Sequence, residues 1–277
     1  KQQPNLLFAA ARYLLGAPAT IETLRALVRD RPDELAAVMM ARRTQTNEPA
    51  RCATLLPALA QLPEPLALIE VGASAGLTLL FDRYSYDYDG HRVTGTDPAA
   101  PVLRCALAGP VPLPRRVPEI VWRAGLDLNP LDISNDDDAL WLSCLLWPAE
   151  GDREERLAAA IATARMDPPP LIRGDLVTDL PAVAANAPDD ATLVIFHSSV
   201  LYYVPMAGRR LFAATIRKLA ASRPRPVTWL SNEGPDVLPD VQVPPGYDRL
   251  PNNLQVRDGR TPFAVADPHG MSVRWLE

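Results

Sequence analysis

The sequence has few of the residues that build disulfide frameworks and metal sites. Its 277 residues include three cysteines, Cys52, Cys105 and Cys144, which are odd in number, far apart and without a C-x-x-C pair. This pattern predicts reduced, buried thiols. Only three histidines occur, and no histidine, cysteine or carboxylate cluster has the spacing of a metal site. The acidic run 136–138 predicts the start of a helix, because negative side chains are favoured at helix N-termini. Its spacing fits no EF-hand loop.

Long hydrophobic runs and an excess of positive charge are missing as well. The most apolar long run, residues 191–208, is interrupted by His197 and Pro205, so no membrane-spanning helix is predicted. The net charge of −5 argues against a general nucleic-acid binder. The first residues show no signal-peptide pattern. We therefore expect a cytoplasmic protein with a small-molecule substrate, and the sequence predicts no particular oligomeric state.

The N-terminal quarter carries a helical pattern. The overall composition, 48% hydrophobic and 22% charged, is that of a globular chain with a sizeable core. Apolar residues spaced three and four apart predict four helices over residues 5–62, with Thr20 as the N-cap of the second. The fourth is expected to begin near Thr46 or Asn47 and to bend at Pro57. We predict an N-terminal helical cap, residues 1–64.

The pattern changes at Leu66. Residues 66–71 form a short apolar run typical of a strand buried on both faces, residues 72–76 form a loop of small residues, and residues 77–81 predict a helix. Strand, glycine loop and helix together begin a doubly wound unit. Residues 84–117 depart from that plan, because alternating tyrosines and the Asp89-Gly90 turn predict an antiparallel insertion.

Parallel order is expected to resume after the insertion. The predicted elements are a strand at 119–126, helices at 136–147 and 152–165, strands at 170–173 and 192–196, a helix at 205–221, a strand at 226–230 and an antiparallel meander at 254–275. Strands that alternate with helices predict an α/β fold. Residues 65–277 are therefore predicted to form a doubly wound, mostly parallel, Rossmann-like sheet.

The sharpest chemical motif is Glu70-x-Gly72-x-x-x-Gly76 after the first buried strand. Glycines let a backbone pass close to a ligand, and an acid at the strand end can hold a positively charged amine. Asp127 ends the next parallel strand and can accept both hydroxyls of a ribose. Asp175 ends the third, where a short polar loop can contact an adenine amine. The three strand ends predict a nucleoside-containing ligand.

These motifs resemble the successive cofactor motifs of class I S-adenosylmethionine-dependent methyltransferases. The residues that carry the resemblance are Glu70-Val71-Gly72, Gly76, residues 125–130 and Gly174-Asp175. Nearly the whole chain also resembles an uncharacterised bacterial family, a domain of unknown function, through residues 46–51, 70–77, 141–148 and 269–270. The resemblance implies a class I methyltransferase-like fold, the cofactor S-adenosylmethionine, and methyl transfer to an unidentified acceptor.

The resemblance also assigns site residues. It places the cofactor against Glu70, Gly72, Ala73, Ser74, Gly76, Asp127, Leu128, Gly174, Asp175 and Leu176. In methyltransferases the ribose acid usually lies nearer the glycine loop, so Asp87 and Asp89 are rivals of Asp127. The loop after the strand that ends at Phe196 commonly holds acceptor or base residues, which implies His197 as a general base and Tyr202 as an orienting group.

Asn47, Glu48 and Arg51 lie within one helical turn and share a face. One interpretation is a substrate-binding role over the pocket, where a closing cap excludes water from the reaction. The other is a helix N-cap with a solvent-exposed salt bridge.

Two other functions are consistent with the same residues. Residues 72–76 also match G-x-S-x-G, the nucleophile elbow of serine hydrolases, with Ser74, then Asp236 or Asp240, then His269 in chain order. The position of the loop on the first strand opposes this interpretation, because no upstream strand supplies a second oxyanion N–H. The third possibility is a methyltransferase-like fold that has lost catalysis and acts as a binding module.

Overall fold

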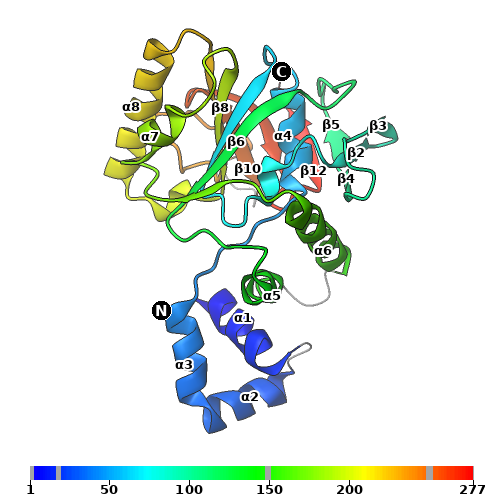
Figure 1. Cartoon of the computed structure of the whole chain (residues 1–277), viewed down its shortest axis with the longest axis vertical. Coiled ribbons are helices and arrows are strands. Elements are labelled where there is room, and N and C mark those ends of the chain that lie inside the picture. Colours follow the sequence, from blue (N-terminus) through cyan, green and yellow to red (C-terminus); the bar gives the residue numbers. More distant parts are fainter. Residues whose placement is uncertain (1–2, 17–19, 147–150, 248–251, 277) are drawn as a thin grey trace.

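The computed structural model describes residues 3–16, 20–146, 151–247 and 252–276. Its centre is a nine-stranded sheet with the order β5-β12-β11-β10-β9-β8-β1-β6-β7 (Figure 1). Neighbours from β7 to β9 run parallel, and neighbours from β9 to β12 run antiparallel. The prediction of an α/β protein with a mostly parallel sheet is confirmed.

The strands of this sheet are short. Their bounds are β1 Leu66–Val71, β5 Ala106–Ala108, β6 Ile120–Asp127, β7 Leu171–Arg173, β8 Thr192–Ser198, β9 Val227–Glu233, β10 Asn253–Arg257, β11 Thr261–Ala266 and β12 Ser272–Trp275. All six residues of β1 are buried, as its unbroken apolar run predicts. From β1 the chain adds β6 and β7 on one side, then β8 and β9 on the other. The strand order therefore reverses between β1 and β8.

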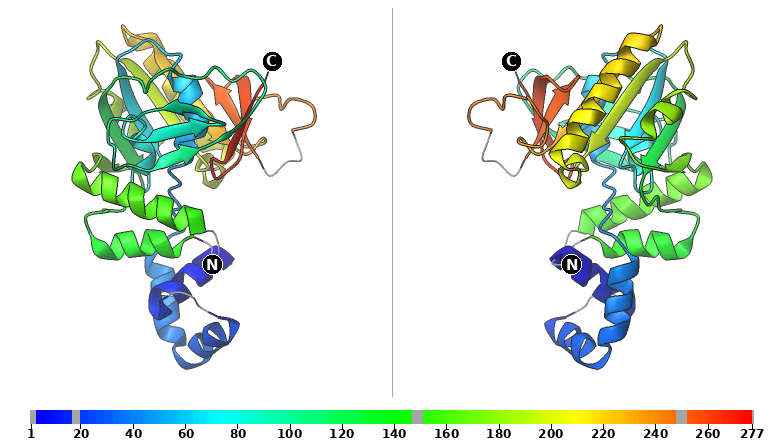
Figure 2. Two further views of the ribbon diagram at one scale, coloured as in Figure 1. Left: turned by 90° about the vertical axis from the view of Figure 1, so that its right-hand side faces the viewer. Right: turned by 90° about the vertical axis from the view of Figure 1, so that its left-hand side faces the viewer.

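Helices cover both faces of the sheet. They are α4 Arg51–Leu59 and α6 Gly151–Met166 on one face, and α7 Leu180–Ala184 and α8 Met206–Ser222 on the other (Figures 1 and 2). Pro57 lies inside α4 and cannot donate a backbone hydrogen bond to the carbonyl of Ala53. The Tyr88 hydroxyl donates to that carbonyl instead, at 2.8 Å. A strand residue thus completes the helix that proline interrupts.

The start of α4 differs from its prediction. The helix begins at Arg51, and residues 42–48 form no helix. The reason is that this segment, which we call the linker (residues 42–50), is held by contacts with the sheet. The side-chain oxygen of Asn47 accepts the backbone N–H of Leu77 at 2.7 Å, and the Gln45 carbonyl accepts the Ser74 hydroxyl at 2.9 Å.

The first three helices form a small group beyond one end of the sheet (Figure 2). They are α1 Pro4–Leu15, α2 Ile21–Asp30 and α3 Pro32–Ala41, and Thr20 caps α2 as predicted by accepting the N–H of Thr23. The group packs on α5 Asp136–Cys144. The predicted end of that helix, Trp147, lies outside the described residues.

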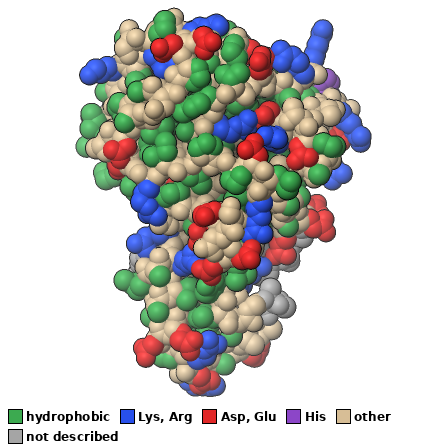
Figure 3. All heavy atoms as spheres, in the orientation of Figure 1, with side chains coloured by type: hydrophobic (Ala, Val, Ile, Leu, Met, Phe, Trp, Pro, Cys, Tyr) green, Lys and Arg blue, Asp and Glu red, His purple; other side chains and the backbone are tan. Residues whose placement is uncertain are grey.

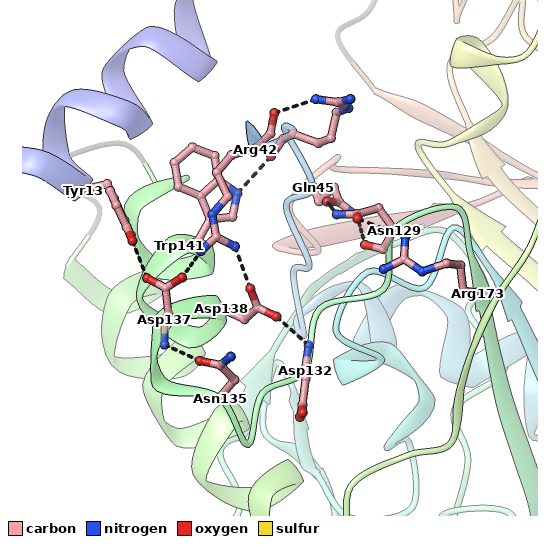
Figure 4. Close-up of polar contacts among 11 residues, drawn as sticks. Tyr13, Arg42, Gln45, Asn129, Asp132, Asn135, Asp137, Asp138, Trp141 and Arg173 are labelled. Carbon is pink, nitrogen blue, oxygen red and sulfur yellow. Dashed lines mark hydrogen bonds and ion pairs between the residues drawn. The ribbon is translucent and has the colours of Figure 1, made fainter. Parts of the chain in front are cut away.

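Arg42 joins the helical group to α5 (Figure 4). Its guanidinium bonds to Asp137 and, at 2.6 Å, to Asp138, and it lies 5.7 Å from the ring centre of Trp141. The Tyr13 hydroxyl donates to the same Asp137. Figure 3 shows basic and acidic side chains interspersed over the face that it presents.

The helix predicted at residues 77–81 is wrong. Only a short 3-10 helix, η1 Leu77–Leu79, follows the glycine loop. Two backbone carbonyls of this segment accept hydrogen bonds from tyrosines a few residues later in the sequence. The Tyr84 hydroxyl donates to the Leu77 carbonyl at 2.8 Å, and the Tyr86 hydroxyl donates to the Phe81 carbonyl at 2.7 Å. Tertiary hydrogen bonds thus take acceptors that a helix would use internally.

The insertion at residues 84–117 is antiparallel only in part. Strands β2 Ser85–Tyr88 and β3 His91–Val93 form the predicted hairpin, with Asp89 and Gly90 both at positive φ. Strand β4 Val102–Arg104 then pairs parallel to β2, and β5 pairs parallel to β12 in the large sheet. The antiparallel meander at the C-terminal end is confirmed.

Among the described residues, no helix combines the length and apolarity that a membrane crossing needs. The three cysteines are buried and free.

Candidate functional site

The carboxyl ends of β1, β6, β8 and β9 meet at one edge of the sheet, and buried charged side chains gather there. In open α/β sheets, ligands bind at this edge, where the strand order reverses. The linker contacts this edge through Gln45 and Asn47. The turn at residues 267–270 packs against the end of the linker and the start of α4. Gly270 has φ +84 and lies so close to Ala50 that a Cβ would stand 2.2 Å from the Ala50 carbonyl carbon. Only glycine fits this contact.

Glu70 is the second-last residue of β1 and is 3% exposed. The Thr78 hydroxyl donates to Oε1, and Oε2 has no hydrogen-bond partner among the described residues. Burial raises the pKa of Glu70 to about 8, against the opposing effects of the Thr78 hydrogen bond and the Arg51 charge. A positively charged group beside Oε2 would favour the carboxylate form. The side chain is therefore suited to an amine.

The glycine loop is tightly folded. Gly72, Ser74 and Gly76 all have positive φ, which bends the chain away from the strand. A Cβ on Gly72 would meet Val200 at 2.4 Å, and a Cβ on Gly76 would meet Pro169 at 2.7 Å. Close packing against Val200 and Pro169 therefore requires glycine at positions 72 and 76. Ala73 and Ser74 are buried between them.

Asp127 lies at the end of β6 and holds the glycine loop. Its Oδ2 accepts the Ser74 N–H at 2.9 Å, and its Oδ1 accepts the Asn129 N–H at 2.7 Å. The structure therefore brings Asp127 to the loop that precedes it by 53 positions. The insertion after residue 83 separates the two in the sequence, and Asp87 and Asp89 lie within that insertion, in and beside β2.

Gln45 of the linker also reaches Asp127. Its amide nitrogen lies 3.3 Å from Oδ1 of Asp127. The same nitrogen lies 2.7 Å from the Asn129 carbonyl, and the Gln45 amide oxygen accepts the Asn129 side chain (Figure 4). Leu128, between the two, is 67% exposed. The linker thus occupies hydrogen-bonding positions on Asp127 and Asn129.

The third strand end is a closed turn. Asp175 accepts the N–H groups of Val177 and Thr178 through Oδ1, at 2.7 and 3.2 Å. Gly174 lies against Asp179 and Leu126, and Leu176 is buried. Asp175 stabilises its own turn and stays partly exposed.

Ser74 is buried, and its hydroxyl donates to the Gln45 carbonyl at 2.9 Å. A carbonyl takes up no proton, so this contact does not activate the hydroxyl as a nucleophile. His269 lies instead near Arg51 and Arg153, whose charges add to burial in lowering its pKa. Asp236 and Asp240 follow β9. The structure shows no hydrogen bond from Ser74 to any of these three predicted hydrolase residues.

His197 lies in β8 and is fully buried. Nε2 accepts the indole N–H of Trp229 at 2.9 Å, and Nδ1 lies 2.8 Å from Oε1 of Glu233. Since Trp229 can only donate, Nε2 carries no proton and Nδ1–H donates to Glu233. Both ring nitrogens are engaged within the protein. This geometry leaves no nitrogen to accept a proton from a substrate, which is the role that the sequence predicts.

Glu233 organises the loop that follows β8. Its Oε1 accepts the N–H groups of Val200 and Leu201 at 2.8 and 3.0 Å, in addition to His197. Its Oε2 is buried without a hydrogen-bond partner. This loop contains the 3-10 helix η2 Leu201–Tyr203, which presents Tyr202 with 49% of its surface exposed. Burial and the adjacent Tyr203 raise the pKa of Tyr202, so its hydroxyl stays protonated at neutral pH.

Asn47 and Glu48 of the linker and Arg51, the first residue of α4, are all buried at this edge. Asn47 holds the Leu77 N–H, and Glu48 forms ion pairs with Arg153 at 2.8 Å and Arg156 at 3.1 Å. Arg51 donates to the carbonyls of Pro268 and Ser198, at 2.8 and 3.4 Å. They face the sheet edge and α6 rather than bulk solvent.

Several residues with polar groups at this edge escaped the sequence analysis. Gln45, which is partly buried, and the buried Trp229 and Glu233 have no motif around them, and each acts through a partner distant in the sequence. Thr78 follows the glycine loop and bonds to Glu70, eight positions earlier. The polar run 231–233 at the end of a buried strand is the one available signal for Glu233. Within the described residues, no group of three or more metal-binding side chains occurs.

The fold defines a mixed α/β protein whose strand order reverses between β1 and β8. The chain belongs to the family described as "Uncharacterized protein conserved in bacteria (DUF2332)", which matches residues 1–275. No curated protein and no solved structure matches the chain.

Proposed function

We propose that this protein is a bacterial S-adenosylmethionine-dependent methyltransferase with a small-molecule acceptor. The observation that carries the proposal is Glu70, a buried acid with one unpartnered oxygen, at the end of the central strand and before a left-handed glycine loop. The strand order β7-β6-β1-β8-β9 corresponds to 3-2-1-4-5 of a doubly wound, Rossmann-like half. Both features agree with the resemblance to class I methyltransferases.

The residues at this edge fit the cofactor at two points. Oε2 of Glu70 suits the ammonium group, and Oδ2 of Asp127 has lone pairs left after accepting one N–H. The contacts of Gln45 must be exchanged for those of the ribose. Gly174, Asp175 and Leu176 remain the proposed adenine-side residues, and Leu128 supplies an exposed apolar surface beside them.

On the acceptor side, we propose a positioning role for His197 in place of a base. The neutral ring fixes Glu233, and Glu233 fixes the backbone of Val200 and Leu201. When bound, S-adenosylmethionine supplies an activated methyl group, and the chain must orient an acceptor toward it. Tyr202 and Tyr203 are exposed in this loop, and Tyr202 is proposed to contact that acceptor.

We further propose that residues 1–64 act as a cap. The linker that leads out of α3 contacts Asp127 and the glycine loop through Gln45, and the loop again through Asn47. A cofactor would lie beneath this linker, which would exclude water from the reacting groups. Residues 65–277 then form the methyltransferase-like domain.

Isothermal titration calorimetry with S-adenosylmethionine and S-adenosylhomocysteine tests the proposal. Because Glu70 has a pKa of about 8, it is mostly protonated at pH 7, and a bound ammonium group should release its proton. The heat of binding should then vary with the ionisation enthalpy of the buffer. Glu70→Gln should abolish that variation and weaken binding by roughly 10-fold or more.

Glu22→Gln is the matched control, since this glutamate lies in the first turn of α2. The proposal fails if neither compound binds at millimolar concentration, or if Glu70→Gln binds both as the wild type does.

A further inference from the structure

A second group of polar side chains lies buried beside Glu70, on neighbouring strands. Ser198, Asn232 and Gln255 are paired in register across β8, β9 and β10, so all three project from the same face of the sheet. Glu70 shares that face, because its register partner on β8 is Phe196, two residues before Ser198. The group therefore adjoins the proposed cofactor site on the side covered by α4.

The amides of this group are not satisfied within the protein. Asn232 and Gln255 are both 0% exposed. Asn232 donates to the Ser198 hydroxyl at 2.8 Å, which leaves its amide oxygen without a partner. In the part of the chain that the structure describes, Gln255 has neither an acceptor for its nitrogen nor a donor for its oxygen. Buried polar groups are rarely left unpaired, because each costs about 1–3 kcal/mol. Unpaired donors and acceptors on facing side chains indicate a missing polar partner.

Arg51 supplies a charge next to these amides. Its guanidinium donates to the Ser198 carbonyl, so Ser198 contacts both Arg51 and Asn232. Arg51 is 7% exposed, and within the described residues its hydrogen bonds go to main-chain carbonyls. The charges of Glu48, Glu233 and Glu70 act on it, but none of these carboxylates forms a direct ion pair with it in the described part of the chain, and Glu48 is already matched by Arg153 and Arg156. A buried guanidinium without a direct ion pair favours an anionic group at its side.

We propose that Arg51, Asn232 and Gln255 form a binding site for a small carboxylic acid that also carries a carboxamide-like group. The carboxylate would bind Arg51. A planar group with an N–H beside a carbonyl would pair with the two amides, since Gln255 offers a donor and an acceptor and Asn232 an acceptor. The identification of this molecule as the methyl acceptor rests on the proposed function; its binding does not.

The test is calorimetry of the wild-type protein, without S-adenosylmethionine, against malonamate, succinamate and glutaramate. These probes differ only in the spacing between carboxylate and carboxamide. We expect at least one to bind with a millimolar or lower Kd. Gln255→Met removes both polar atoms at similar volume, and Arg51→Gln removes the charge. Each should weaken binding by about tenfold or more.

Two exposed positions provide matched controls, Gln242→Met and Arg210→Gln, which should bind as the wild type does. Circular dichroism confirms folding of each variant. Esterification of the carboxylate of the best probe with methanol removes its negative charge and leaves the carboxamide unchanged. This methyl ester should bind at least tenfold more weakly.

The proposal is overturned if no probe binds at about 10 mM, or if binding is equal in Gln255→Met, which would mean that the amides hold buried water only. Its failure is distinct from failure of the proposed function. Binding of S-adenosylmethionine without any probe would refute the acid site alone, and binding of a probe without S-adenosylmethionine would refute the methyltransferase alone.

Discussion

The indole N–H of Trp229 points at Nε2 of His197 across 2.9 Å, and this single contact fixes the protonation of a buried histidine. Glu233 takes the other ring nitrogen at 2.8 Å. The three side chains form a chain of donors and acceptors that ends on the backbone of the loop after β8. The resemblance implies His197 as a general base, but both of its ring nitrogens form hydrogen bonds within the protein.

We expect His197→Ala to destabilise the protein by about 3 kcal/mol, because it leaves the Trp229 N–H and the Glu233 carboxylate without their partner. Chemical denaturation measures this loss. Nitrogen-15 NMR of the wild type should show a proton on Nδ1 and none on Nε2 at pH 7. A resonance for Nε2–H, or for a doubly protonated ring, would contradict the assignment.

Glu70 should make stability depend on pH. Its pKa is raised from 4.5 to about 8 on folding, so the folded state holds a proton that the unfolded state has lost. The contribution is therefore fully present below about pH 4.5 and declines as the pH rises toward 8, by on the order of a few kcal/mol. Urea unfolding from pH 5 to 8.5 should show this decline in the wild type.

Glu70→Gln should flatten that pH profile and become more stable than the wild type above pH 8. Parallel profiles for the two proteins would show that Glu70 does not hold the proton.

Gln45→Ala should strengthen the binding of adenosine-containing ligands by roughly 5-fold, since the amide that competes for Asp127 is removed. Calorimetry with S-adenosylhomocysteine measures the change, and Gln242→Ala is the exposed control. Weaker binding in Gln45→Ala would mean that this side chain contacts the ligand instead of competing with it.

Tyr88→Phe should cost about 1–2 kcal/mol, because the Ala53 carbonyl loses the hydroxyl that replaces the missing N–H of Pro57. In a Pro57→Ala background the restored N–H can bond that carbonyl, so the same Tyr88→Phe change should cost less. A double-mutant cycle from urea unfolding tests the coupling. Equal costs in the two backgrounds would show that the hydroxyl does not serve the helix.

Ser74 should not react with a fluorophosphonate probe. Its hydroxyl donates to a carbonyl and has no base at hand. Mass spectrometry of the intact protein after labelling measures the reaction. Stoichiometric labelling that disappears in His269→Ala would favour the serine hydrolase alternative.

The parts of the fold that the sequence predicts well are those specified locally. β1 and β8 are runs of buried, mostly apolar residues, and the hairpins at Asp89-Gly90 and Asp258-Gly259 have turn residues that accept positive φ. The predictions that fail concern segments whose structure depends on contacts with residues outside the segment. Nothing in the sequence of residues 77–81 indicates that the hydroxyls of Tyr84 and Tyr86 will donate hydrogen bonds to the backbone carbonyls of this segment.

The candidate site divides in the same way. Glu70, the glycine loop and Asp127 lie at strand ends, so strand prediction alone brings them to one edge. The environment of His197 depends on partners 32 and 36 positions away, which no local pattern reveals. The contacts of Gln45 depend on a linker whose path is set by the sheet beneath it.

Arg51 and the Pro268 carbonyl, 217 positions apart, meet across the site, and Gly270 is pressed against Ala50. During synthesis, the early helices and the central strands emerge long before the turn that covers them. The edge is therefore completed only when the last hairpin docks, which gives folding a late, long-range step. A chain interrupted between residues 177 and 267 would carry every predicted cofactor motif and still lack the contacts of Arg51 with Pro268 and of Ala50 with Gly270.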